Sequence, residues 1–185
     1  MCSVQLHRPP GCVIAIDPGN KDSAFVVLEN GVPVDIGLHD NEFVLALLDY
    51  LKLVWPDATL VIEMIACYGM PVGSEVFDTC VWIGRFTERW TSEVPPAVVE
   101  YVFRKDVKMN LCQNMRAKDA NIRQALIDRF GGKEAGVGNK KDPGPLHGVK
   151  KDIWSALAVG LTYIDGKDNG RCGEETHPVG RKSEV

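Results

Sequence analysis

Three acidic residues stand where short apolar segments of the chain begin or end. Asp17 follows the apolar run 13–16 and Glu63 follows 60–62, so each carboxylate is expected at the tip of a strand. Asp152 precedes an apolar helical segment, where the helix dipole favours an anion. Mg²⁺ and Mn²⁺ prefer carboxylate oxygens, and two such ions roughly 4 Å apart assist hydrolysis of a phosphodiester. The sequence therefore predicts a site for two divalent metal ions, Mg²⁺ or Mn²⁺, at Asp17, Glu63 and Asp152, with no organic cofactor.

Each of the three acids also has an ordinary structural interpretation. Asp17 precedes Pro18 and Gly19 and would suit a turn. Glu63 would suit the solvated rim of a strand, and Asp152 would suit the N-cap of a helix. These interpretations weigh less when the three acids are taken together, because one sheet edge would gather all three.

The segments that must position these acids predict an α/β fold with a five-stranded mixed sheet flanked by helices. Strands are expected at 13–17, 23–29, 32–38, 59–63 and 97–102, the second and third joined by a hairpin at Asn30-Gly31. Helices are expected from 41 to before Pro56, from 74 to about 90, and at 118–130 and 152–164, with Asn41 and Ser74 as caps of the first two. The predicted order is three antiparallel strands, then helix, strand, helix, strand, helix, helix.

The rest of the chain is expected to carry less regular structure. Residues 131–148 are rich in Gly, Pro and Lys, which predicts a mobile basic loop. A single domain over 12–165 is expected, with flexible termini at 1–11 and 166–185.

Composition excludes several classes of protein. The chain has 185 residues, 45% of them hydrophobic and 25% charged, which is typical of a globular domain. Its apolar runs are too short to span a bilayer, and residues 1–11 lack the apolar core of a signal peptide. None of the six cysteines forms a CxxC pair, which argues against a zinc module and favours reduced thiols in a cytoplasmic location.

The net charge of −4 conceals a strong asymmetry along the chain. Residues 40–100 contain ten acids and three bases, about −7, whereas residues 101–151 contain twelve bases and five acids, about +7. Such a dipolar chain can dock phosphates on one side while it stays soluble. The candidate nucleic-acid-binding residues are Arg104, Lys105, Lys108, Lys118, Lys140, Lys141, Lys150 and Lys151.

Residues 14–20, IAIDPGN, resemble the opening of RuvC-type Holliday junction resolvases, which belong to the RNase H-like nuclease superfamily. Residues 60–63, LVIE, resemble the second acidic strand of that family. The basic stretch 102–108 with 117–119 resembles the region beside its cleft, and residues 152–158, DIWSALA, resemble its last motif. The resemblance covers roughly 12–164 and implies an RNase H-like fold.

The resemblance also implies roles for individual residues. Asp17, Glu63 and Asp152 would bind metal, and Lys108 and Lys118 would lie near the scissile phosphate. Family members usually carry a fourth ligand, Asp or His, one helical turn before the last Asp, but here that place holds Val149. His147 is our choice for the missing ligand, with Asp142 or a site of three carboxylates as alternatives.

Two aromatic groups have less specific interpretations. The aromatic residues of the second long helix are expected mostly in the core, although Trp82 and Phe86 would line a dimer interface by the resemblance. Tyr68 and Met70, in the loop after Glu63, would be placed to wedge into branched DNA.

The function implied by the resemblance is an endonuclease that resolves four-way DNA junctions. It would act as a homodimer in the cytoplasm, or in the host cytoplasm if a phage or prophage encodes it. An RNase H-like enzyme on RNA–DNA hybrids or branched DNA remains an alternative, as does a DNA-binding module with a decayed site. ATP-binding proteins of the actin and sugar-kinase type also open on a strand, Asp and Gly turn, but they need a longer chain and further Gly-rich loops.

Overall fold

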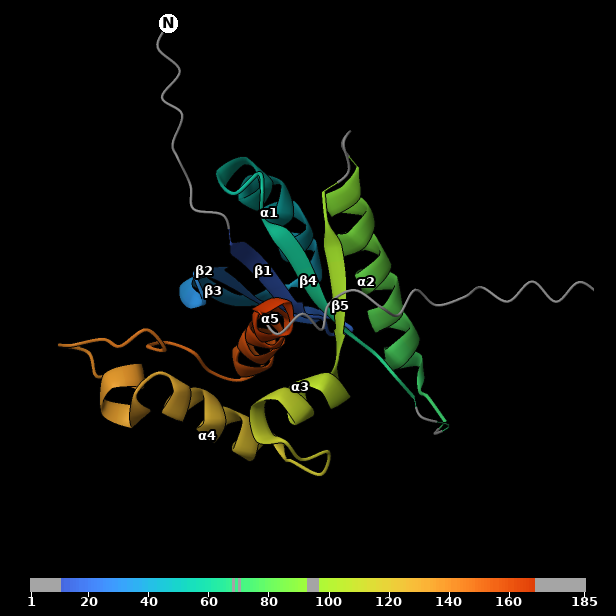
Figure 1. Cartoon of the computed structure of the whole chain (residues 1–185). Helices are drawn as coiled ribbons and strands as arrows, with labels where there is room; N and C mark the ends of the chain where they lie inside the picture. The colour runs from blue at the N-terminus through green and yellow to red at the C-terminus, as the bar shows by residue number, and fades with distance from the viewer. Residues whose placement is uncertain (1–10, 68, 70, 93–96, 169–185) are drawn as a thin grey trace, which may run out of the picture.

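The computed structural model describes residues 11–67, 69, 71–92 and 97–168. In these ranges five strands form one mixed sheet in the order β3-β2-β1-β4-β5 (Figure 1). The antiparallel part comprises β1 (Cys12–Asp17), β2 (Asp22–Glu29) and β3 (Val32–Asp40). The strands β4 (Thr59–Met64) and β5 (Val99–Phe103) extend it in parallel with β1. The predicted fold class is therefore confirmed.

Helices cover both faces of this sheet (Figure 1). One face packs against α1 (Asn41–Val54) and α2 (Ser74–Thr91), and the other against α5 (Ile153–Asp168). Two further helices, α3 (Arg104–Cys112) and α4 (Asp119–Arg129), pack against α5 on its outer side. The sheet is thus the central layer of a three-layer structure.

The alternation of side chains along β1 divides the core in two. Ile14 and Ile16 belong to the cluster under α1 and α2, while Val13 and Ala15 belong to the cluster under α5. This follows from the two-residue period of a strand buried on both faces. Because both faces hold β1 in place, the position of Asp17 at its end is fixed from two sides.

The helix α5 lies close to the sheet because Gly160 lacks a side chain. A Cβ atom built on Gly160 would lie 2.5 Å from Cδ1 of Leu28 and 2.9 Å from Cβ of Ala15. The helix is buried on most sides, from Ile153 to Tyr163. It therefore serves as a rigid support for the residues at its N-terminus.

The helix caps differ from those predicted. Asp40, rather than Asn41, caps α1, with its side chain accepting a hydrogen bond from the Phe43 N–H at 2.9 Å. Asn41 is instead buried and bonds to the chain after β1. Gly73 occupies the N-cap position of α2, so Ser74 is the first residue of the helix and not its cap.

The sequence also failed to predict α3, which changes the element order after β5. Only Val107 of this helix is buried, so its nine residues show little apolar periodicity. The strands and the other four helices were predicted within a few residues. At the C-terminal end, α5 continues to Asp168, past the predicted end of this helix at residue 164.

Residues 131–148, which the composition predicted to be a mobile basic loop, contain local regular structure. They contain a π-helical turn over Lys133–Val137, and Gly138 forms an isolated β-bridge with Pro143. Leu146 is fully buried in the cluster under α5 and anchors the end of this segment. We refer to residues 131–148 as the basic segment.

The aromatic residues of α2 divide between the core and the surface. Phe86 and Trp90 are fully buried within the chain's own core, so the interpretation of Phe86 as a dimer contact is wrong. Trp82 is half-buried against Phe86, and Phe77 is exposed. Among the described residues, no helix has the length and apolar character needed to cross a membrane.

Candidate active site

The pairing of β1 with β4 brings two of the predicted acids together. The parallel register that pairs Ile16 with Ile62 places Asp17 beside Glu63 at the carboxyl ends of both strands. The two carboxyl groups lie close enough for each to affect the pKa of the other. This pair, which we call the acidic pair, confirms that the strand ends meet at one edge of the sheet.

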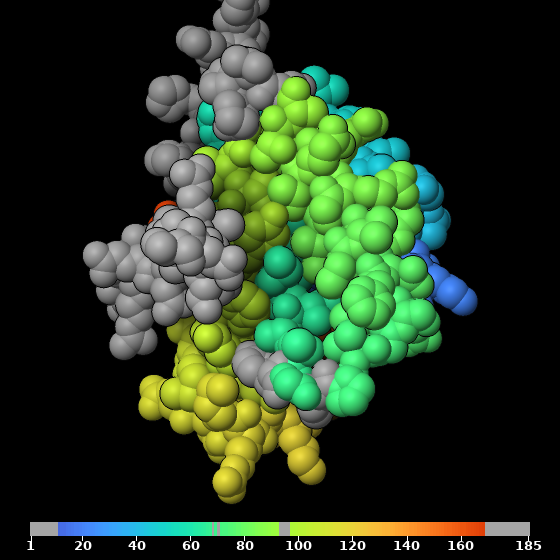
Figure 2. All heavy atoms as spheres, turned by 90° about the vertical axis from the view of Figure 1, so that its right-hand side faces the viewer, coloured from blue at the N-terminus to red at the C-terminus, as the bar shows by residue number. Residues whose placement is uncertain are grey.

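The acidic pair opens into a cleft of about 370 Å³. Its walls are the ends of β1 and β4 together with Arg104 of α3 and Ser155 of α5. Figure 2 shows the end of β4 at the bottom of a hollow between α2 and the β5–α3 segment. The cleft thus joins the ends of two central strands to two helices, α3 and α5.

Burial dominates the electrostatics of the acidic pair. It raises the pKa of Asp17 from 3.8 to about 8, with further increases from the charge and hydrogen bond of Glu63 and from the charge of Asp152. Burial also raises the pKa of Glu63, while the nearby Arg104 guanidinium opposes that rise. Two buried carboxylates in contact retain a proton because they lack sufficient positive charge. A divalent cation offers the positive charge that such a pair needs.

Arg104 is the cation nearest to this pair among the contacts of the described residues. Its Nη1 lies 3.7 Å from Oε1 of Glu63 and 3.5 Å from the Ser155 hydroxyl. Its Nη2 contacts the carboxylate of Asp119. The guanidinium therefore lies between a buried acid of the cleft and an exposed acid at the start of α4.

Asp152 lies close to the acidic pair but outside the cleft wall. It is exposed just before α5, and its carbonyl accepts hydrogen bonds from the N–H groups of Ser155 at 2.9 Å and Ala156 at 3.1 Å. It is near enough for its charge to raise the pKa of Asp17. The described residues contain no group of three or more His, Cys, Asp or Glu placed to hold a metal ion. The structure therefore assembles a pair of acids with a third one nearby.

Val149 stands where the resemblance would put a fourth ligand. Its side chain is buried in the core cluster under α5. His147 and Asp142 are exposed and do not line the cleft. The role of His147 stays a prediction.

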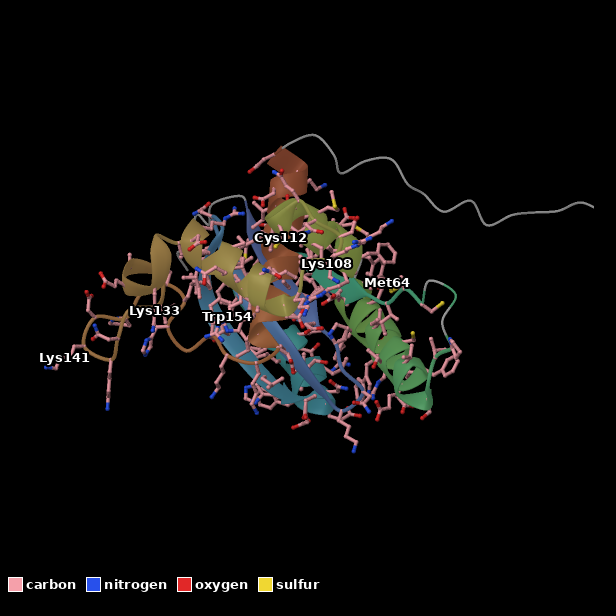
Figure 3. The ribbon with its side chains drawn as sticks, turned by 90° about the horizontal axis from the view of Figure 1, so that it is seen from below. Met64, Lys108, Cys112, Lys133, Lys141 and Trp154 are labelled. Atoms are coloured by element: carbon pink, nitrogen blue, oxygen red, sulfur yellow. The ribbon has the colours of Figure 1, made fainter. Side chains whose placement is uncertain are left out.

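The predicted DNA-binding residues lie on the α3–α4 side, in the basic segment and just before α5. Lys108 is half-buried on α3, and the remaining lysines of the set are exposed: Lys105, Lys118, Lys140, Lys141, Lys150 and Lys151. Figure 3 shows Lys141 at the far end of the basic segment, well away from Met64 at the end of β4. Tyr68 and Met70 lie outside the described residues.

Sequence reasoning placed Arg104 among the DNA contacts and missed its pairing with Glu63 and Asp119. A signal was present, because Arg104 directly follows β5, whose parallel pairing with β4 directs it to the same sheet edge. No comparable sequence pattern predicted that Ser155 would line the cleft, because only the packing of α5 brings it there.

Comparison with known proteins supports the fold through structure alone. No protein-family model and no curated protein matches the chain. The structure of T. thermophilus RuvC in complex with a Holliday junction substrate superposes with a TM-score of 0.60 at 14% identity, over 86% of this chain and 96% of that one. A second Thermus thermophilus RuvC structure gives a TM-score of 0.58 at 17% identity, over 86% and 97%. The chain therefore has the RuvC-type, RNase H-like fold.

Proposed function

We propose that this protein is a metal-dependent endonuclease that resolves four-way DNA junctions by symmetric hydrolysis of phosphodiesters. The observation that carries the proposal is the acidic pair, in which Asp17 and Glu63 meet at the carboxyl ends of adjacent parallel strands. A site at this edge of an open α/β sheet is where ligands generally bind. The same fold in a RuvC bound to a Holliday junction supports the choice of substrate.

The residues present fit divalent metal ions. Mg²⁺ is usually held by one or two carboxylates, with water and substrate phosphate completing its coordination. Asp17 and Glu63 would provide the carboxylates of the cleft and Asp152 a third, for one or two Mg²⁺ or Mn²⁺ ions. Bound ions would supply Lewis acidity toward the scissile phosphate. Lys118 and His147 are proposed to act at the rim of the site.

The proposed DNA contacts are the predicted bases on the α3–α4 side, in the basic segment and just before α5: Arg104, Lys105, Lys108, Lys118, Lys140, Lys141, Lys150 and Lys151. Positively charged side chains release counterions from the DNA backbone, so binding would weaken steeply with salt. A homodimer would place two sites about a two-fold axis and allow paired cuts in one junction. Recognition would depend on the shape of the branch rather than on base contacts.

A synthetic four-way junction with Mg²⁺ tests this proposal. The wild type should give paired nicks, and Asp17→Asn should lower the rate at least about 100-fold because the pair loses a charged ligand. Asp57→Asn is the matched control, since Asp57 is exposed and precedes β4, whereas Glu63 lies near the other end of that strand. Equal cleavage by wild type and Asp17→Asn would contradict the assignment.

Two observations favour a second function, which is junction binding without cleavage. Val149 packs in the core, and only two acids line the cleft among the described residues. It predicts that the protein binds the junction tightly but leaves it uncut with both Mg²⁺ and Mn²⁺. An RNA–DNA hybrid and a branched duplex in the same assay separate the junction enzyme from a nuclease of other specificity.

A further inference from the structure

Arg104 is held between two acids with different surroundings. Glu63 is a buried acid whose side chain is 14% exposed, whereas the side chain of Asp119 is 85% exposed. The guanidinium lies within ion-pair distance of Glu63, at 3.7 Å, but beyond hydrogen-bond distance. It makes its direct hydrogen bond to Asp119.

Two acids on different elements thus flank one cation. Arg104 begins α3 and Asp119 begins α4, so the two residues come from adjacent helices outside the sheet. Glu63 belongs to the end of β4 and lies deeper in the cleft. A contact with Asp119 draws the guanidinium toward the rim of the cleft, and a contact with Glu63 draws it inward. Ser155, at 3.5 Å, lies within reach of the same guanidinium.

We propose that Arg104 is an internal counter-cation of the acidic pair, and that Asp119 is the tether that holds it away from Glu63 when a divalent cation binds. The proposal rests on the metal site of the proposed function and adds the residues that set its affinity. A positive charge beside a metal site opposes the binding of a metal cation, and this opposition grows as the distance between the two charges shortens. The position of Arg104 therefore controls how strongly Glu63 can bind a metal ion.

The proposal gives opposite effects for the two partners. Arg104→Gln removes the competing cation and should tighten Mg²⁺ binding about threefold or more. Asp119→Asn releases the tether, allows Arg104 to approach Glu63, and should weaken Mg²⁺ binding about threefold. A purely structural role for the Arg104–Asp119 pair would lower thermal stability in both variants and leave the Kd for Mg²⁺ unchanged.

The double variant distinguishes a tether from simple loss of a negative charge. If Asp119 acts through Arg104, then Asp119→Asn should have no effect on Mg²⁺ affinity in the Arg104→Gln background. If Asp119 acts only as a nearby negative charge, its loss should weaken binding equally in both backgrounds, and the proposal is overturned. Asp128→Asn, another exposed acid on α4, serves as the control for loss of charge on that helix.

Isothermal titration of the DNA-free protein with MgCl₂ measures all of these affinities without reference to cleavage. Wild type and Asp17→Asn are titrated in parallel. Mg²⁺ binding that depends on Asp17 but has the same Kd in the wild type and in Arg104→Gln would overturn this inference alone and leave the metal site in place. Absence of Asp17-dependent binding would overturn both the metal site and the inference.

A measurement on the wild type covers the case in which Arg104→Gln fails to fold. The Nε–H resonance of Arg104 should shift as Mg²⁺ is added and should saturate at the calorimetric Kd, because the ion displaces the guanidinium from Glu63. A resonance that does not change at saturating Mg²⁺ would overturn the proposal.

Discussion

Asn41 accepts a hydrogen bond from the Ser23 hydroxyl at 2.5 Å, and both side chains are almost completely buried. The amide of Asn41 donates to the Gly19 carbonyl at 2.9 Å, and the Gly19 N–H donates to Ser23 at 3.3 Å. These three bonds tie the turn after Asp17 to the beginning of α1. A Cβ on Gly19 would lie 2.4 Å from the Asp22 carbonyl oxygen, so the turn admits no side chain there.

We predict that Asn41→Ala lowers both stability and metal affinity. The change leaves the Ser23 hydroxyl and the Gly19 carbonyl without their partner, at a cost of about 1–3 kcal/mol. A less constrained turn should also lower the rise in Tm that Mg²⁺ produces, because Asp17 is no longer held in place. Asn139→Ala is the control, because Asn139 is an exposed residue of the basic segment. An unchanged Mg²⁺ effect in Asn41→Ala would restrict Asn41 to a structural role.

The stability of the metal-free protein should fall as pH rises. The pKa of Asp17 is about 8 in the folded chain and 3.8 ordinarily, so between these values the folded state binds the extra proton. Stability therefore decreases from about pH 4 to about pH 8 and changes little through this group outside that window. Calorimetry in EDTA measures the effect as the difference between wild type and Asp17→Asn. At pH 8 the variant should be more stable by at least about 1 kcal/mol, or about 2–4 °C in Tm. Parallel pH profiles for the two proteins would contradict this.

Removal of Mg²⁺ by a chelator should lower Tm more at pH 8 than at pH 5. At pH 8 Mg²⁺ replaces the proton of the acidic pair, so removal of Mg²⁺ should lower Tm by several degrees. At pH 5 the proton competes with the metal and EDTA should change Tm little. Thermal scans with MgCl₂ or EDTA at both pH values test this. A chelation effect equal at the two pH values would place the metal elsewhere.

The basic segment should contribute to DNA affinity but not to metal binding. Lys140 and Lys141 are exposed, and the Asn139 side chain accepts hydrogen bonds from the backbone N–H groups of Lys141 and Asp142 at 2.9 and 3.2 Å, which orders their turn. The double variant Lys140→Gln/Lys141→Gln should weaken junction binding about tenfold. The slope of log K for junction binding against log salt concentration should become shallower by up to about two. The Mg²⁺-induced rise in Tm, measured on the same protein, should stay at the wild-type value. An unaltered salt slope would exclude these lysines as phosphate contacts.

Two glycines give a matched pair for the packing of α5. Gly160→Ala brings a methyl group against Ala15 and Leu28 and should destabilise the fold by about 1–3 kcal/mol. Gly84→Ala in α2 meets no atom within 4 Å and should stabilise by up to about 1 kcal/mol through helix propensity. Urea unfolding of both variants tests the difference. Equal effects would show that α5 can move away from the sheet at little cost.

The sequence predicted the sheet and the meeting of Asp17 with Glu63 because both depend on local signals. Apolar runs of strand length end in an acid, and parallel strands bring their ends to one edge. It did not predict α3, because Val107 is the buried residue of this helix, packed in the same cluster as α5, and one buried position gives no periodicity. Caps were misassigned by one residue, because Asp40 and Asn41 both suit the N-cap and only tertiary bonding separates them.

The contacts of Arg104 could not be predicted for a different reason. The residue type and its position after β5 directed it to the cleft, but its choice of partner depends on the placement of α4. Likewise, Val149 was recognised as an unusual residue, and only the structure shows that its side chain packs in the core.

The placement of α5 has a consequence for the synthesis of the protein. This helix, which follows every other described element in the chain, covers β1, the first strand, so one face of the sheet stays apolar and open until residues 153–163 have been made. Contacts between such distant parts of a chain form slowly, and the exposed face is prone to aggregation meanwhile. A nascent chain would therefore expose this face during synthesis, and it would acquire Asp152 and the proposed ability to cut DNA only once the ribosome has passed the start of α5.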